Sequence, residues 1–201
     1  TSPSMYRLDV KVTGRAAHAG LEPEKGISAI EVVAHAISRM KLGRIDHETT
    51  ANIGLVQGGT AMNVVMEQLE FVGEVRSFDH HKCLEQVNMM EALLNEVVST
   101  YGAKLEFHAT PLITGYHFEE THPLLVHAKT CLETIGRRAR FERSGGGTDA
   151  NVFNEQGKVV VNLSIGYDEI HTVNEYIPVD EFEQAVILTL ELVRQMPSFP
   201  A

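Results

Sequence analysis

Apolar and polar residues alternate in three stretches within the first 110 residues, which is typical of half-buried β-strands, and a further short strand is predicted between the first two of them. In the first of them, Tyr6, Leu8, Val10 and Val12 fall on one face. The four predicted strands span residues 6–12, 52–57, 69–76 and 103–110.

Two stretches between these strands carry apolar residues at intervals of three and four, which predicts amphipathic helices over residues 27–40 and 80–101. Gly43 and Gly102 follow them as stop signals, and Asp79 can accept the free amides at the start of the second helix. The order strand, helix, strand, strand, helix, strand predicts a ferredoxin-like βαββαβ domain. Such a sheet has two free edges, so we expect a homodimer formed through this domain.

The pattern changes after Pro111, and we place a domain boundary there, with residues 1–112 in the first domain and 113–201 in the second. Helices are predicted at 121–135 and from Asp180 to residue 193, the latter with a capping-box-like start.

A glycine turn, a short helix and two strands complete the second domain, the strands at 140–143 and 159–163. In the second of these, Val159, Val160, Val161 and Leu163 form an apolar run, typical of a parallel strand covered on both faces. Two strands cannot bury themselves as a sheet. We therefore expect an α+β protein in which a ferredoxin-like domain precedes an incomplete α/β segment, whose flanking strands come from elsewhere.

Composition narrows the possible partners. The formal net charge is −10 over 201 residues, without a long basic cluster, which disfavours nucleic acid and anionic membrane surfaces. No apolar run is long enough to span a bilayer, and we expect no charged-then-apolar leader. The two cysteines, Cys83 and Cys131, have no CxxC spacing, so we expect a reduced, cytoplasmic setting.

Two histidines stand out as candidates for chemistry. His171 follows the apolar strand and a glycine loop, with Glu175 four residues on; it is either a zinc ligand oriented by that carboxylate or a hydrogen-bonded surface residue. His18 lies in the turn after the first strand, where it is either a general acid or oxyanion donor or a polar turn residue.

Three other clusters have simpler interpretations. Asp79, with the two histidines that follow it, begins a helix, so a cap is favoured over a metal site. Glu119 and Glu120 precede a helix, where its dipole favours acidic residues. The three glycines before Thr148 could present amides to an anion, but their spacing fits neither a Walker loop nor a dinucleotide fingerprint.

Five motifs in register resemble one enzyme family: GRAAHAGLEPEKGISAI, GGTAMNVV, GEVRSFD, SGGGTDANVF and NLSIGYDEIHTVNEYI. The chain resembles the lid (dimerisation) domain plus the C-terminal catalytic segment of the co-catalytic zinc exopeptidases typified by peptidase T, carboxypeptidase G and aminoacylase. The glycine turn and the IHTVNEYI ending are most similar to the peptidase T-like branch.

The resemblance implies roles for individual residues. It makes His171 a zinc ligand, and His18 the lid histidine that stabilises the oxyanion in the partner subunit's site. It makes Asn63 and Arg76 substrate-holding residues, the latter by pairing with a carboxylate. Gly166 matches a glycine loop close to the substrate, and Gly146 belongs to a turn that shapes the same wall.

The other zinc ligands of the family, an HxD motif, a bridging aspartate and a Glu-Glu pair, lie upstream of the lid and have no counterpart in this sequence. We therefore expect two zinc ions in the full-length protein, a di-zinc aminopeptidase hydrolysing short peptides. This chain alone is expected to be an inactive, dimer-forming fragment that does not hold zinc tightly. The alternatives are a non-catalytic ferredoxin-like binding or regulatory module, and a zinc amidohydrolase acting on N-acyl amino acids.

Overall fold

A computed structural model describes residues 1–196, which divide into two compact units. The first contains Thr1–Tyr116 together with Ser144–Val152, and the second contains His117–Arg143 together with the residues from Phe153 onward. The glycine turn at 144–147, which the sequence analysis assigned to the second domain, is thus grouped with the first unit. The last five residues of the predicted second domain lie outside the described residues.

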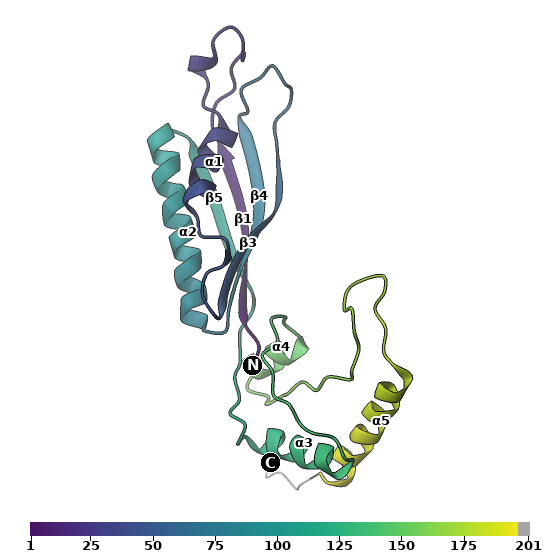
Figure 1. Cartoon of the computed structure of the whole chain (residues 1–201). Helices are drawn as coiled ribbons and strands as arrows, with labels where there is room; N and C mark the ends of the chain where they lie inside the picture. The colour runs from purple at the N-terminus through teal and green to yellow at the C-terminus, as the bar shows by residue number, and fades with distance from the viewer. Residues whose placement is uncertain (197–201) are drawn as a thin grey trace. The chain divides into compact units, whose positions relative to one another are not determined.

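The first unit has the predicted βαββαβ order (Figure 1). Its elements are β1 (Ser4–Thr13), α1 (Ala29–Arg39), β3 (Thr49–Gly58), β4 (Gln68–Ser77), α2 (His80–Tyr101) and β5 (Lys104–Ile113), with a two-residue β2 (Gly43–Arg44) and a 3-10 turn η1 (Pro23–Lys25). The strands form one antiparallel sheet in the order β2-β3-β4-β1-β5. The ferredoxin-like prediction is therefore confirmed.

The helices α1 and α2 pack on the same face of this sheet (Figure 1). The hydrophobic core lies between these helices and the sheet. The alternation in β1 and β4 is observed as predicted, since Leu8, Val10 and Val12 on β1 and Phe71 and Val75 on β4 are buried. The opposite face of the sheet carries the polar residues, so one face is dry and one is solvated.

The helix α1 buries most of the apolar residues that predicted it, but not all of them. The set at intervals of three and four was Ile27, Ile30, Val33, Ala34, Ile37 and Met40; Val33 is buried, Ile27, Ile37 and Met40 pack against the core, and Ile30 and Ala34 are exposed. Ala29, Val32 and Ala36, which were not in the set, also face the core. Small alanines at two positions of this face let the helix lie close to the sheet. The helix also ends before Gly43, at the cap residue Met40.

Capping fixes the ends of α2 as predicted. Asp79 accepts hydrogen bonds from the backbone N–H groups of His81 and Lys82, at 2.8 and 3.2 Å. Gly102 ends the helix in the left-handed region with φ of 69°, a conformation that favours glycine. The helix interpretation of this acidic and histidine cluster is therefore supported by its geometry.

The segments before β1 and after β5 lie side by side. Ser2 and Tyr116 exchange two backbone hydrogen bonds of 3.0 and 3.1 Å. Next to them the Gly115 N–H donates to the hydroxyl of buried Ser4 at 2.8 Å, and that hydroxyl lies 3.0 Å from Nδ1 of His80. The two connecting segments are thus held side by side.

In the second unit, α3 (Pro123–Thr134) packs against α5 (Val179–Arg194). An ion pair of 2.8 Å joins Arg137 to Glu181. The residue before α5 is Pro178, with no side-chain cap, so the capping box predicted at Asp180 is wrong and Asp180 lies in the first helical turn. The short helix predicted after the glycines is α4 (Asp149–Glu155).

The two strands predicted in the second domain do not form. Residues 140–143 and 159–163 have no strand partner in the described part of the chain, and Val159 and Leu163 are exposed. The side chain of Asn154 holds the second stretch extended, with hydrogen bonds of 3.0 and 2.8 Å to the backbone N–H and C=O of Val160. A strand needs a neighbouring strand to pair with, and in residues 1–196 neither stretch is paired with one.

Candidate functional site

Two loops at one end of the lid sheet bring His18 and Asn63 together. Ala19 N–H donates to the carbonyl of Asn63 at 3.0 Å, and Val65 N–H donates to the carbonyl of Ala17 at 2.9 Å. These bonds close the loop after β1 against the loop before β4. Both His18 and Asn63 remain exposed, so both side chains are available to a ligand or to another chain.

The hydrogen bonding of His18 determines which ring nitrogen is a donor. The Gly20 N–H donates to Nδ1 of His18 at 3.1 Å, so the neutral imidazole carries its proton on Nε2. A ring held in this tautomer offers an outward N–H donor. That is the form an oxyanion-stabilising histidine needs.

Arg76 lies at the opposite end of the same sheet. Its Nε and Nη2 bond to the two carboxylate oxygens of Glu74 at 3.0 and 2.8 Å, and its Nη1 donates to the carbonyl of Gly145 at 3.0 Å. Arg76 is thus already paired with one carboxylate and with the glycine turn that contains Gly146. A substrate carboxylate would have to share or displace Glu74.

A buried asparagine fixes the glycine turn, and the sequence analysis did not single it out. Asn151 is 1% exposed, and its Oδ1 accepts from Thr148 N–H and from the Ser2 hydroxyl, both at 3.0 Å. Its amide donates to the carbonyl of Thr114 at 2.8 Å. The only sequence signal for this role is its place at the end of the GGGTDAN motif.

The strand β4 separates these two groups of residues. Asn63 precedes β4, Arg76 is near its end, and the strand has 10 residues. At about 3.3 Å per residue the two ends lie roughly 30 Å apart. His18 and Arg76 of one copy therefore cannot contact the same small ligand.

His171 occupies the tip of a loop in the second unit. The loop is closed by an isolated bridge between Asp168 and Tyr176, with hydrogen bonds of 2.9 and 3.3 Å. His171 has φ of 65°, which is uncommon for a residue other than glycine. The Glu175 carboxylate accepts from its backbone N–H at 2.6 Å, so Glu175 holds the loop rather than the ring. The imidazole is exposed.

Gly166, the other site residue predicted in this unit, contacts α5. Its φ is 84°, and a Cβ at this position would lie 2.8 Å from Cβ of Glu181. Any side chain here would push away the residue that pairs with Arg137. Gly166 therefore permits a close approach of backbone to helix, as a glycine loop requires.

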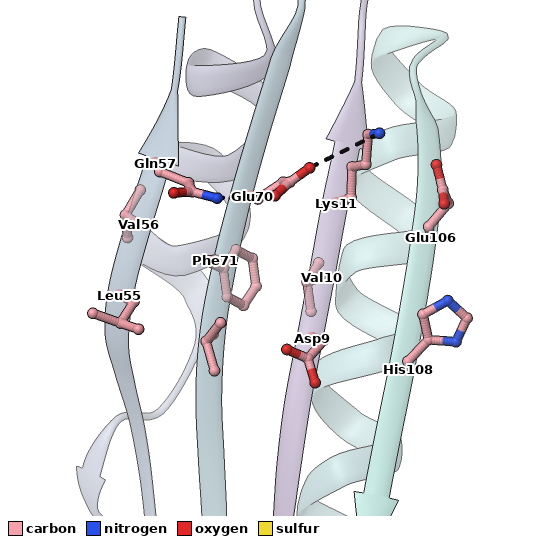
Figure 2. A pocket seen from close by; sticks show the side chains of 11 residues that line it. Asp9, Val10, Lys11, Leu55, Val56, Gln57, Glu70, Phe71, Glu106 and His108 are labelled. Atoms are coloured by element: carbon pink, nitrogen blue, oxygen red, sulfur yellow. Dashed lines mark hydrogen bonds and ion pairs between the residues drawn. The ribbon is translucent and has the colours of Figure 1, made fainter.

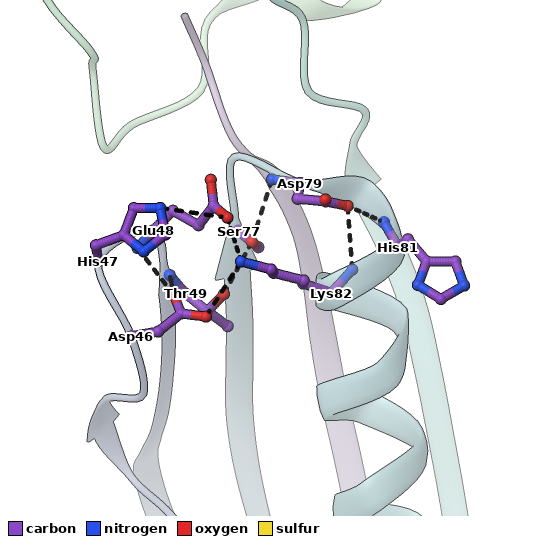
Figure 3. A network of polar contacts seen from close by, with 8 residues as sticks. All are labelled: Asp46, His47, Glu48, Thr49, Ser77, Asp79, His81 and Lys82. Atoms are coloured by element: carbon purple, nitrogen blue, oxygen red, sulfur yellow. Dashed lines mark hydrogen bonds and ion pairs between the residues drawn. The ribbon is translucent and has the colours of Figure 1, made fainter.

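One group of three potential metal ligands occurs in residues 1–196, formed by Asp46, His47 and Glu48 (Figure 3). Lys82 pairs with both carboxylates, and Asp46 accepts from the N–H groups of Glu48 and Thr49 at 2.9 and 2.7 Å. These backbone bonds, with a smaller contribution from Lys82, lower the pKa of Asp46 to about 2. These three residues form a turn, and ion pairs to Lys82 hold this turn against the start of α2.

A zinc centre needs three or four ligands. Among the described residues His171 belongs to no group of three potential ligands, and the carboxylates of Asp46 and Glu48 are paired with Lys82. The residues of this chain therefore do not by themselves fit a two-metal centre. His171 can supply one ligand to a site completed by other residues.

The open face of the lid sheet forms a shallow groove (Figure 2). Its charges are largely paired with one another: Glu70 lies 3.9 Å from Lys11 and accepts from Gln57 at 3.1 Å, and Asp9 pairs with Arg7 at 2.7 Å. Such a surface is typical of a solvated sheet face. It gives little support to a regulatory ligand site.

The match to a family model decides the affiliation. Residues 4–102 match the model of the peptidase dimerisation domain of the M20 group. This domain of the chain belongs to the dimerisation domains of the M20 peptidase family. The matched range runs from the start of β1 to the end of α2 and includes His18, Asn63 and Arg76.

Solved M20-like structures extend the similarity to both units. The aminopeptidase PepT from Bacillus cereus ATCC 10987 is 39% identical, with a TM-score of 0.89 over 96% of this chain and 52% of that one. A tripeptidase from Staphylococcus aureus subsp. aureus Mu50 is 34% identical, with a TM-score of 0.92 over the same shares. The uncharacterized protein YqjE of Bacillus subtilis is 38% identical over 96% of this chain and 52% of its own length. This M20 chain thus spans about half the length of these relatives.

Among residues 1–196, no helix combines the length and the apolar character that crossing a membrane requires.

Proposed function

We propose that this M20 chain is part of a metallopeptidase that hydrolyses short peptides, in the manner of a tripeptide aminopeptidase. The observation that carries the proposal is the similarity of both units, at 39% and 34% identity, to solved structures named as an aminopeptidase and a tripeptidase. In this proposal the chain provides the lid, the dimer contact and one metal ligand, His171, with two zinc ions in the complete enzyme. By itself the chain is inactive.

The geometry of the lid supports an active site that is built from residues of two subunits. His18 and Asn63 lie roughly 30 Å from Arg76 along one strand, so a single site that uses all three must draw them from two copies. The Nε2–H of His18 then acts as an electrostatic donor in the partner's site. Arg76, with the glycine turn around Gly146, serves the copy to which it belongs, and Gly166 lines the wall near His171.

The two edges of the sheet differ in how strongly their residues discourage the addition of another strand. This difference favours β3 as the dimer contact. The strand β5 carries Pro111 and charged side chains, which discourage strand addition. The strand β3 pairs with β2 only at Thr50 and Ala51, and beyond them its free edge has no charge. Leu55 and Val56 on this edge are 66% and 58% exposed.

A charge on the β3 edge is expected to abolish the dimer. Val56→Lys places an ammonium group where a second copy's strand would pair, so the variant should be monomeric at concentrations at which the unmodified chain is dimeric. Light scattering coupled to size-exclusion chromatography measures this directly. Met89→Lys, on an exposed site of α2, is the matched control and should stay dimeric. A dimeric V56K variant would place the contact elsewhere.

The proposed function is tested by joining this chain to the part of a relative that it does not match. The part of the Staphylococcus aureus tripeptidase that this chain does not match is fused to it, and tripeptide hydrolysis and bound metal are measured. We expect hydrolysis by the fusion and none by the chain alone. His171→Ala in the fusion should lower kcat/KM by at least about 100-fold, because even outer partners of metal ligands cost 10–100-fold. Bound metal should fall as well.

The alternatives give different results in the same fusion. His47→Ala, in the exposed turn before β3, is the control and should retain activity and metal. Hydrolysis of N-acyl amino acids but not of tripeptides would indicate the amidohydrolase. A folded fusion that binds no metal would indicate the non-catalytic binding module and contradict the proposal.

A further inference from the structure

Two of the three residues of the glycine turn lie in open space. An ideal Cβ on Gly145 would meet no atom within 4 Å, and one on Gly146 would meet only the hydroxyl of Ser144, at 3.9 Å. Glycine also loses more conformational freedom on folding than any other residue. The conformation of this turn must therefore be fixed by groups that lie outside it.

The segments before β1 and after β5 both contact the turn. On the first segment, the hydroxyl of Ser2 donates to the carbonyl of Gly146 at 3.2 Å. On the second, the side chain of Ile113 lies so close to Gly147 that a Cβ on this glycine would be 2.1 Å from Cδ1 of Ile113. The turn is thus held by the two segments that flank the sheet domain, and it is grouped with that domain in the first unit.

The side chain of Asn151 joins the turn to both flanking segments. Its Oδ1 accepts from Thr148 N–H and from the Ser2 hydroxyl, both at 3.0 Å, and its amide donates to the carbonyl of Thr114 at 2.8 Å. These bonds use both acceptor positions and one donor of the side chain. Because Asn151 is only 1% exposed, water does not compete for them. The side chain cannot rotate without breaking bonds to all three segments.

We propose that Asn151 is a positioning residue for the peptide site: it holds the glycine turn in the arrangement that the two flanking segments set. The inference rests on the proposed function, in which this turn shapes the wall of the site, and it adds a buried residue that does not touch the substrate. Arg76 contacts the same wall, since its Nη1 donates to the carbonyl of Gly145 at 3.0 Å. Loss of the Asn151 bonds displaces the wall and this guanidinium contact together, so substrate binding weakens while the metal ligand His171 is unaffected.

The kinetic test uses the fusion with the unmatched part of the Staphylococcus aureus tripeptidase. Asn151→Ala should raise KM for a tripeptide by about 10-fold, equivalent to about 1.4 kcal/mol and close to the net value of one hydrogen bond. Because the turn binds the substrate in both the ground state and the transition state, kcat should change by less than about threefold. Bound metal should be unchanged.

Asn154→Ala is the matched control for a general loss of stability. Asn154 is on the same helix, α4, and its side chain also bonds to backbone groups, but to those of Val160, at 3.0 and 2.8 Å. This variant should unfold at a lower urea concentration than the unmodified fusion and keep its KM. An equal rise in KM for N154A and N151A would contradict a specific role of Asn151.

A second variant keeps the test decisive if N151A does not fold. Ser2→Ala removes only the hydroxyl that bonds to Asn151 and to Gly146, and it should raise KM by less than N151A does. The double variant S2A/N151A should raise KM no more than N151A alone, because both side chains act through the same turn. An unchanged KM in S2A, or additive effects in the double variant, would overturn the inference.

Amide hydrogen exchange on the full chain gives a readout that does not need activity. The Thr148 amide, which donates to Asn151, should exchange faster in N151A, whereas amides in the middle of β4 should keep their protection. Unaltered exchange at Thr148, or an active fusion in which N151A leaves KM unchanged, would overturn the inference. A folded, unmodified fusion that hydrolyses no peptide would refute the proposed function, and faster exchange at Thr148 would then still support the role of Asn151 in holding the turn.

Discussion

Replacing Phe71 by alanine is expected to lower the free energy of unfolding of the lid by about 3–5 kcal/mol, the usual cost of removing a buried aromatic ring. Phe71 is 1% exposed, and its neighbours in register are Val10 on β1 and Val56 on β3. The ring fills the space between sheet and helices, so its loss leaves a cavity that the surrounding strands cannot close. Small domains are stable by about 5–15 kcal/mol, so the variant should approach global unfolding at body temperature.

Urea denaturation followed by circular dichroism measures this effect. Val72→Ala is the matched control because Val72 is the next residue of β4 and points to the open face, where it is only partly buried. It should cost about 1 kcal/mol or less. Equal losses for the two variants would mean that the sheet does not have one dry face.

Replacing Gly14 by alanine should open the loop that carries His18. An ideal Cβ on Gly14 would lie 2.0 Å from the carbonyl oxygen of Ile27 and 2.9 Å from its carbonyl carbon, so a backbone segment must move. Ile27 and Arg15 exchange two hydrogen bonds of 2.9 Å at this point, and Gly14 N–H donates to Glu67 at 2.7 Å. We expect the free energy of unfolding to fall by about 1–3 kcal/mol, as is typical of overpacking. The destabilisation should be concentrated in this loop.

Hydrogen exchange resolves where the loss occurs. The amides of Arg15 and Ile27 should lose protection in G14A, whereas core amides of β4 should keep most of theirs. Gly145→Ala is the control, since its Cβ would meet no atom within 4 Å and its φ does not require glycine. In the fused enzyme G14A should also reduce activity, because the loop bonds that place His18 beside Asn63 would be broken. Unchanged protection of Arg15 and Ile27 would contradict this account.

The lid could be predicted from its sequence because each element carries its own signal. The alternation in β1 and β4, the Asp79 cap and the Gly102 stop are all local, and the structure has each of them. The buried face of α1 could not be predicted in the same way. Its apolar residues extend over more than one side, and packing against the sheet decides that Val32 is buried and Ile30 is exposed.

The second unit shows where local signals are insufficient. The apolar run at 159–163 has strand composition, but a strand is defined by its neighbours, and these are absent from the described residues. The roles predicted for the site residues came from the resemblance to a family, because position along the chain alone left His171 either a zinc ligand or a surface residue. The contacts of Arg76 with Gly145 and of Asn151 with Thr114 are tertiary, and neither followed from spacing along the chain.

The hydrogen bonds between Ser2 and Tyr116 hold the two ends of the sheet domain close together, which makes this domain suitable for insertion into another protein. Ser2, just before β1, and Tyr116, just after β5, form an isolated antiparallel bridge, so these two ends of the sheet domain are only about 5 Å apart. A host protein could accept the whole domain at a single surface turn without widening any other part of its structure. Because the two ends are close together, the lid of one peptidase could replace the lid of another through two junctions at one place on the surface. The recipient would then dimerise through the new lid.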